Sequence, residues 1–289
     1  MKINKTYAGI PEKFSKIETA KIVLVPVSYD GTSTWQKGAD KGPSAFLEAS
    51  ENMELYDIET NSEVYKKGIY LSDSISDFDS PDEMIDTVYK ITKKYISKNK
   101  FVTIFGGEHS ISIATVKAFN DSFDNLSVLH IDAHADLRDS YNGEKFSHAS
   151  AIRRCLDYKN VSVISFGIRN ISKSEIPYLQ KNKSRINIFW AKDKSKWDLR
   201  KFKKLIKNKT VYLTFDVDGF DSSIMPATGT PEPGGLLWDE TLNIIKVAAK
   251  NSNIVGADIN ELAPIRGFNS YNFLVAKLAY NILSYKFLI

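Results

Sequence analysis

Cysteine is almost absent from this sequence, because Cys155 is the only one in 289 residues. No disulfide can form within the chain, so we expect a protein of a reducing compartment, the cytoplasm. Cys155 lies in an apolar run with Ile152 and Leu156, which is typical of a buried core thiol rather than of a reactive one.

An excess of one charge and long apolar runs are also missing. The chain has 39 Lys+Arg and 35 Asp+Glu, and a net charge of +4 is too small to predict binding to nucleic acid or a membrane surface. No run of about 18 apolar residues predicts a membrane span, and the first 16 residues lack the apolar part of a signal peptide. The Lys-rich segment 192–209 has apolar residues near helical spacing, so we interpret it as a solvated amphipathic helix.

Short runs rich in β-branched residues alternate with helical patterns along the whole chain. Continuous apolar strands that alternate with helices predict a parallel sheet covered on both faces. No linker, repeat or low-complexity tract divides the sequence, so we predict one α/β domain over residues 1–289. The predicted strands are 21–27, 101–105, 126–131, 161–166, 186–190, 210–215 and 254–259, and the predicted helices include 82–98, 110–119, 148–157, 198–207 and 239–250.

Four of these strands bring histidine or acidic residues to their ends. Ligands of open α/β sheets bind beyond the carboxyl ends of the strands, so these side chains predict a site at that edge. Gly106 and Gly107 allow a tight turn after one strand, and Ser110 is expected to cap the next helix. The polar residues are Glu108 and His109; Asp132, His134 and Asp136; Asp216, Asp218 and Asp221; and Asp258 and Glu261.

Asp132, His134 and Asp136 stand at alternating positions after a buried strand, so they point to the same side. Unpaired charges there would cost several kcal/mol or more, and bound metal compensates for them. With Asp216 and Asp218 the set offers mainly oxygen ligands and no thiolate, which favours an octahedral-tending ion such as Mn²⁺ over a structural zinc site. Together with His109, the set is large enough for two ions about 3.5–4 Å apart.

Several segments of the sequence resemble the signature segments of the ureohydrolase family, which includes arginase and agmatinase. The match runs from about Leu24 to Pro264, and two segments, DGTS and TGTPEPGG, are more similar to agmatinases than to arginases. The segments are YDGTSTWQKGADKGPSAF (29–46), GGEHS (106–110), DAHAD (132–136), SHAS (147–150), DVDGFD (216–221), TGTPEPGG (228–235) and DINELAP (258–264).

The resemblance implies a three-layer α/β/α fold around a mainly parallel, eight-stranded sheet, with two Mn²⁺ per subunit. It also implies a homo-oligomer, a trimer or hexamer. His148 would match the family's proton-shuttling histidine and Glu261 the carboxylate that binds the guanidinium. By position, one ion would be held by His109, Asp132, Asp136 and Asp216, and the other by Asp132, His134, Asp216 and Asp218.

The chemistry of guanidinium hydrolysis agrees with these implied roles. Metals lower the pKa of water so that hydroxide is present near neutral pH. Glu261 can hold the planar guanidinium through two hydrogen bonds, and His148 can protonate the leaving amine. The products would be urea and an amine, which is putrescine if the substrate is agmatine and would connect the reaction to polyamine biosynthesis.

Two alternatives belong to other functional classes. A binuclear phosphohydrolase would need cations to hold phosphate, whereas these strand ends are acidic and Arg138 is the nearby cation. A non-catalytic homologue would be expected to have lost ligands, and all the proposed ones are present. Without the resemblance, His148 would fit a surface histidine and Glu261 an acid at a helix start.

The expected substrate is a small cationic guanidino compound, with agmatine first. Residues 137–141 (LRDSY) lack the polar pattern with which arginases bind an amino acid. Arginine, guanidino acids and formimidoylglutamate remain alternatives. Arg138 has two possible roles: it supports its loop through Asp139 or Glu144, or it binds the acidic tail of such a substrate.

Overall fold

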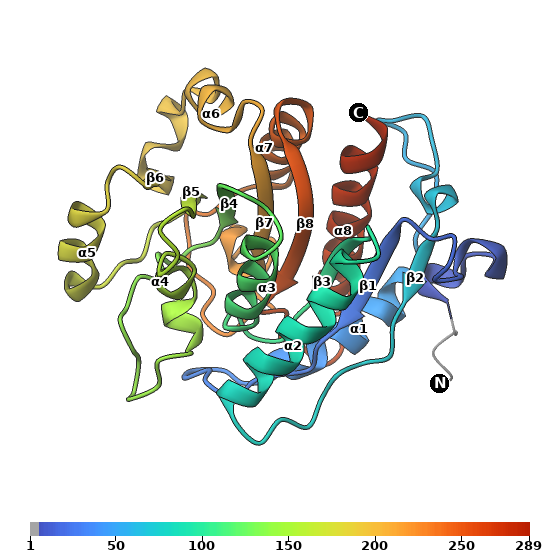
Figure 1. The fold of residues 1–289 in the computed structure, drawn as a ribbon, viewed down its shortest axis with the longest axis horizontal. Helices are drawn as coiled ribbons and strands as arrows, with labels where there is room; N and C mark the ends of the chain where they lie inside the picture. Colours follow the sequence, from blue (N-terminus) through green and yellow to red (C-terminus); the bar gives the residue numbers. More distant parts are fainter. Residues whose placement is uncertain (1–5) are drawn as a thin grey trace.

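All of the predicted strands belong to one sheet, in which every neighbouring pair is parallel (Figure 1). The computed structural model describes residues 6–289. Its strands are β1 (Ile22–Pro26), β2 (Ile69–Leu71), β3 (Phe101–Phe105), β4 (Leu126–Ile131), β5 (Ser162–Phe166), β6 (Ile186–Phe189), β7 (Thr210–Asp216) and β8 (Asn253–Asn260). Across the sheet their order is β2-β1-β3-β8-β7-β4-β5-β6, so the eight-stranded parallel sheet is confirmed.

Helices cover both faces of this sheet. The five predicted helical segments are helical, with ends that differ by a few residues. The helices are α1 (Gly42–Ser50), α2 (Pro81–Ile96), α3 (Ile111–Asn120), α4 (Ala151–Cys155), α5 (Ile176–Lys181), α6 (Leu199–Ile206), α7 (Trp238–Asn251) and α8 (Ser270–Leu288). Within residues 6–289, every helix falls short of the length and apolar character that a membrane-spanning segment requires.

Strand alternation divides the core into two layers. In β1, Ile22 and Leu24 pack on the side of α1, α6, α7 and α8, whereas Val23 and Val25 pack on the side of α2, α3 and α4. Each buried aliphatic side chain of this kind contributes roughly 1.5–3 kcal/mol. The two apolar layers therefore hold the sheet rigid between its helices.

Two predictions about individual segments can be compared with this core. Cys155 is buried, as expected. In the Lys-rich segment, α6 is amphipathic because Phe202 and Ile206 are buried, but 191–196 forms a 3-10 helix instead of extending α6.

The four central strands determine where a site can form. β3, β8, β7 and β4 are direct neighbours in that order. These are the four strands whose ends carry the histidine and acidic residues, so the loops after them meet at one edge of the sheet.

Candidate active site and metal centre

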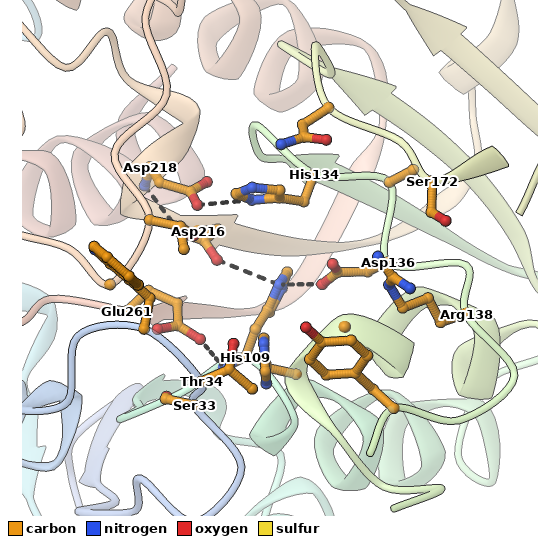
Figure 2. A pocket seen from close by; sticks show the side chains of 18 of the residues that line it. Ser33, Thr34, His109, His134, Asp136, Arg138, Ser172, Asp216, Asp218 and Glu261 are labelled. Atoms are coloured by element: carbon orange, nitrogen blue, oxygen red, sulfur yellow. Dashed lines mark hydrogen bonds and ion pairs between the residues drawn. The ribbon is translucent and has the colours of Figure 1, made fainter. Parts of the chain in front are cut away.

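His109 lies at the centre of a group of carboxylates. Its Nδ1 atom is 3.0 Å from Oδ2 of Asp136 and 3.5 Å from Oδ2 of Asp216 (Figure 2), and it is 3.1 Å from Oδ2 of Asp132. This nitrogen is buried and has no well-aligned hydrogen-bond partner, whereas Nε2 lies 2.8 Å from the hydroxyl of Thr214. A buried nitrogen that faces three carboxylate oxygens fits a cation between them.

A second group lies beside the first. Nδ1 of His134 is 2.9 Å from Oδ2 of Asp218 and 3.6 Å from Oδ1 of Asp132. Asp132 thus presents one oxygen to each histidine, and its position suits a carboxylate that bridges two ions. Two clusters have potential ligand atoms within 4.8 Å of one another: His109, Asp132 and Asp136 together with His130, and Asp132, His134 and Asp218.

The electrostatics of the acids also favour bound cations. Burial and the neighbouring Asp132 raise the pKa of Asp136 to about 6. Burial, Asp218 and Asp132 raise the pKa of Asp216 well above its usual range. Burial disfavours protonation of His134, but Asp218 and Asp132 outweigh it and raise its pKa to about 12. Divalent ions would relieve this repulsion, and the oxygen and imidazole donors fit them.

The backbone is strained at two site residues. Asp136 has φ 51° and Glu261 has φ 68°, both in the left-handed region that costs a residue with a side chain about 1–3 kcal/mol. The backbone N–H of Glu261 donates to the carbonyl of Gly107 at 2.7 Å, which fixes this conformation. Oε1 of Glu261 in turn accepts the backbone N–H of His109 at 2.8 Å. The strained backbone thus holds the carboxylate of Glu261 in a fixed position beside the candidate metal ligands.

His148 begins a short 3-10 helix (His148–Ser150) and lines the same cavity as His109 and His134. Its Nδ1 lies 3.1 Å from the hydroxyl of Thr32, and its ring meets Tyr141 edge-on with 5.7 Å between centroids. Burial, with the charges of His134 and His109, lowers the pKa of His148 to about 4. The imidazole is therefore neutral near pH 7 and has a lone pair on one ring nitrogen.

One cavity of about 200 Å³ joins these groups. It is lined by His109, His134, Asp136, His148, Asp216, Asp218 and Glu261, seven of the eight residues predicted for the site. The eighth, Asp132, is fully buried beneath them. The structure therefore brings all eight predicted residues together.

Sequence reasoning missed His130 and Thr32 as parts of this site, and it named Glu108 only as a polar residue at the sheet edge. His130 lies under the metal candidates, with Nε2 2.8 Å from Oδ2 of Asp132 and Nδ1 3.1 Å from the hydroxyl of Ser165. The alternation of polar residues in β4 and its loop already includes position 130, and this was the available signal. Glu108 and Thr32 interact across 76 residues of sequence, for which no local pattern exists.

Asp258, expected at the site edge, instead lies outside the cavity. It is fully buried, and its carboxylate accepts hydrogen bonds from Tyr212 (2.7 Å), Thr115 (3.1 Å) and Asn260 (2.7 Å). These three donors satisfy the charge within the core. Asp258 is therefore a structural residue beneath the sheet edge.

Asp221 and Ser110 also differ from expectation. Asp221 accepts the backbone N–H groups of Ser223, Gly234 and Gly235, so it fixes the TGTPEPGG loop instead of facing the cavity. Ser110 occupies the position before α3, but its hydroxyl donates to Oε1 of Glu108 at 2.5 Å and does not cap the helix.

Arg138 does not support its loop through the acids we considered. Asp139 pairs with Arg153 and Arg154, and the side chain of Glu144 accepts the backbone N–H of Phe146. The guanidinium of Arg138 lies 4.7 Å over the ring of Tyr141 and lines the cavity. It has no ion pair within residues 6–289.

Comparisons with known proteins agree with this geometry. The model of the arginase family matches residues 20–284. The N(1)-aminopropylagmatine ureohydrolase of Synechocystis sp. is 35% identical and is aligned over 98% of this chain and 96% of its own length. The agmatinase of Bacillus cereus is 31% identical over 92% of each protein.

A solved structure extends the similarity to the whole fold. The crystal structure of the agmatine ureohydrolase of Thermoplasma volcanium matches with a TM-score of 0.87 and 27% sequence identity. The match covers 99% of this chain and 95% of the other.

Proposed function

Because this chain belongs to the arginase family, we propose that it is a manganese-dependent enzyme that hydrolyses agmatine to putrescine and urea. Enzymes of this family in the comparisons, the agmatinases and ureohydrolases, act on guanidino C–N bonds. The observation that carries the proposal is the buried Nδ1 of His109 among three carboxylates, with Glu261 fixed beside it. A cation site next to an anchored carboxylate suits the hydrolysis of a guanidinium.

We propose that two Mn²⁺ ions occupy the centre. His109, Asp132, Asp136 and Asp216 would hold one, and Asp132, His134, Asp216 and Asp218 the other. When bound, the ions would supply a water activated for attack near neutral pH. Oxygen ligands with two imidazoles support manganese, and the role of Asp132 as a bridge is supported by its contacts with both histidines.

The residues of the chain would bind the substrate and move one proton. Glu261 has one oxygen engaged by the N–H of His109, which leaves Oε2 and further lone pairs of Oε1 for the guanidinium N–H groups. Neutral His148 would accept the proton that the attacking water loses and pass it to the departing nitrogen. With that proton the nitrogen leaves as a neutral amine, the protonated urea that remains loses its hydroxyl proton to the amine or to solvent, and His148 returns to its neutral form.

The acidic cavity supports a cationic substrate over an acidic one. Asp136, Asp216, Asp218 and Glu261 all line it, so a carboxylate brought near them would be repelled. Arg138 is the exception, because its unpaired guanidinium could bind an acidic tail. Guanidino acids, arginine and formimidoylglutamate are therefore the alternatives that the test must include.

N(1)-aminopropylagmatine is a second candidate substrate with its own support. Trp35 lines the cavity, yet 75% of its surface is exposed, so the cavity reaches the protein surface there. A longer polyamine tail could extend along this ring, since aromatic faces attract cations. The similarity to the Synechocystis sp. enzyme of that name points the same way.

A competition assay would separate these substrates. Manganese-loaded protein is offered agmatine, N(1)-aminopropylagmatine, arginine, 4-guanidinobutyrate and formimidoylglutamate at equal concentrations, and urea or formamide is measured. We expect agmatine to be hydrolysed fastest. A faster rate with any other compound would overturn the agmatine assignment, and no product from any of them would overturn the hydrolase proposal.

We also propose a cytoplasmic homo-oligomer, a trimer or hexamer. The single cysteine supports the compartment, and the family resemblance supports the assembly. Light scattering of the purified protein would test the assembly, and a monomer at micromolar concentration would contradict it.

A further inference from the structure

We infer that Thr32 is a positioning residue that fixes the tautomer of His148, and that Glu108 holds Thr32 in place for this purpose. The inference rests on the proposed function, in which His148 moves the proton. It assigns a role to the DGTS segment, which neither the metal centre nor the guanidinium site uses.

The contacts of Thr32 form a short chain from the core to His148. Its backbone N–H donates to Oε2 of Glu108 at 2.6 Å, and its hydroxyl donates to Oε1 of the same carboxylate at 2.7 Å. The hydroxyl oxygen accepts the backbone N–H of His148 at 3.0 Å and lies 3.1 Å from Nδ1 of that ring. Glu108 is fully buried, so the carboxylate end of this chain is shielded from water.

Counting hydrogens assigns the tautomer. A threonine hydroxyl has one proton to donate and two lone pairs to accept with. The proton is directed to Glu108, so at His148 the oxygen can only accept. Nδ1 must therefore carry the hydrogen of the neutral ring, and Nε2 keeps the free lone pair. Since Nδ1 is occupied by Thr32, Nε2 is the nitrogen left to take a proton.

The backbone around Glu108 permits this arrangement. Glu108 donates its N–H to the carbonyl of Tyr29 at 2.9 Å, which brings the 29–32 segment against the turn after β3. A Cβ on Gly107 would lie 1.8 Å from that carbonyl oxygen, so only glycine fits there. The glycine turn and the DGTS segment therefore act together to place Thr32 beside His148.

Tautomer control has a kinetic consequence. A histidine in the wrong tautomer presents N–H where a lone pair is needed and cannot accept a proton. Loss of the Thr32 hydroxyl should therefore lower turnover, whereas the guanidinium site at Glu261 and the metal ligands keep all their contacts. The expected signature is a lower kcat with a nearly unchanged KM.

The test compares Thr32→Val, which keeps the shape but lacks the hydroxyl, with Thr32→Ser, which keeps the hydroxyl. We expect Thr32→Val to lower kcat by about 10- to 100-fold, a part of the roughly 100- to 10,000-fold that general acid–base catalysis contributes. Its KM should stay within about twofold, and Thr32→Ser should restore most of kcat. Thr19→Val is the matched control, because the Thr19 hydroxyl contacts only the carbonyl of Lys16 at the surface. Metal content and melting temperature are measured for each variant.

The tautomer itself is measured by ¹⁵N NMR of histidine-labelled protein with diamagnetic Mg²⁺ in place of Mn²⁺. The chain has only four histidines, so the spectrum can be assigned by single substitutions. We expect His148 to carry its hydrogen on Nδ1 in the unmodified protein and in Thr32→Ser, and to lose this preference in Thr32→Val.

Two results would overturn the inference: a Thr32→Val enzyme with unchanged kcat, or an unchanged His148 tautomer in that variant. The NMR measurement needs no substrate. It therefore remains decisive if agmatine proves to be the wrong substrate.

Discussion

His130 lies directly behind Asp132, with its Nε2 atom 2.8 Å from Oδ2 of the carboxylate that faces both candidate metal positions. Both residues are fully buried. Groups behind a metal ligand orient it and tune its affinity, and their loss typically weakens metal binding 10- to 100-fold.

We therefore predict that His130→Phe weakens Mn²⁺ binding by about 10- to 100-fold. Metal titration followed by activity would show a higher Mn²⁺ requirement with a large part of the maximal rate retained. Ser165→Ala, which removes only the partner of Nδ1, serves as the milder comparison. Equal Mn²⁺ affinity in His130→Phe and the unmodified protein would show that His130 does not orient the ligand.

Metal removal should abolish activity. After dialysis against a chelator, Mn²⁺ should restore the rate better than Mg²⁺ or Zn²⁺. Asp132→Asn and Asp216→Asn are expected to be the most damaging single changes, because each removes a charge shared by both ions. Metal analysis of active protein checks this directly, and one zinc or no metal per chain would contradict the binuclear proposal.

Substitutions at Glu261 and His148 should separate binding from proton transfer. Glu261→Gln should raise KM, since the amide replaces a carboxylate that accepts guanidinium N–H groups. His148→Asn should lower kcat by about 100-fold or more while the metals stay bound. Steady-state kinetics with metal analysis measures both, and an unchanged rate in either variant would remove that residue's proposed role.

Activity should rise from pH 6 toward pH 9. The pKa of His148 is lowered to about 4, so its imidazole is already neutral across this range and its titration does not limit the rate. The rise then follows ionisation of the water in the metal site. A pH–rate profile tests this. An optimum below pH 6 would contradict ionisation of the metal-site water as the cause of the rise.

Arg138→Ala should change the order of substrate preference only if the natural substrate carries an acidic tail. We expect the variant to keep agmatine as its best substrate, because the tail of agmatine is positively charged and is not attracted by the guanidinium of Arg138. The competition assay on both proteins measures the effect. A reversal from 4-guanidinobutyrate or formimidoylglutamate to agmatine on substitution would show that Arg138 recognises a carboxylate.

Local patterns predicted the parts of this site that lie on one strand and its loop. Asp132, His134 and Asp136 follow from alternation, and their place at the sheet edge follows from parallel pairing. Asp258 was misjudged because its donors, Tyr212 and Thr115, come from other elements.

The limits of the fold prediction have a similar origin. α8 is buried on most sides, so it has no polar stripe to reveal its period, and β2 has only three residues. Thr32 shows the same limit within the site, because its role depends on contacts with residues 76 and 116 positions away.

The place of β8 in the sheet has a consequence for synthesis of the protein. β8 is made last among the strands, yet it lies between β3 and β7. A nascent chain that ends before residue 253 thus lacks the strand that joins the β2-β1-β3 half to the β7-β4-β5-β6 half. His109 comes from one half, whereas Asp132, Asp136 and Asp216 come from the other, so the site proposed for the ion that His109 holds should be complete only after β8 has joined the sheet. Binding of that ion should accordingly be a late event in folding, and its onset would report that the two halves have joined.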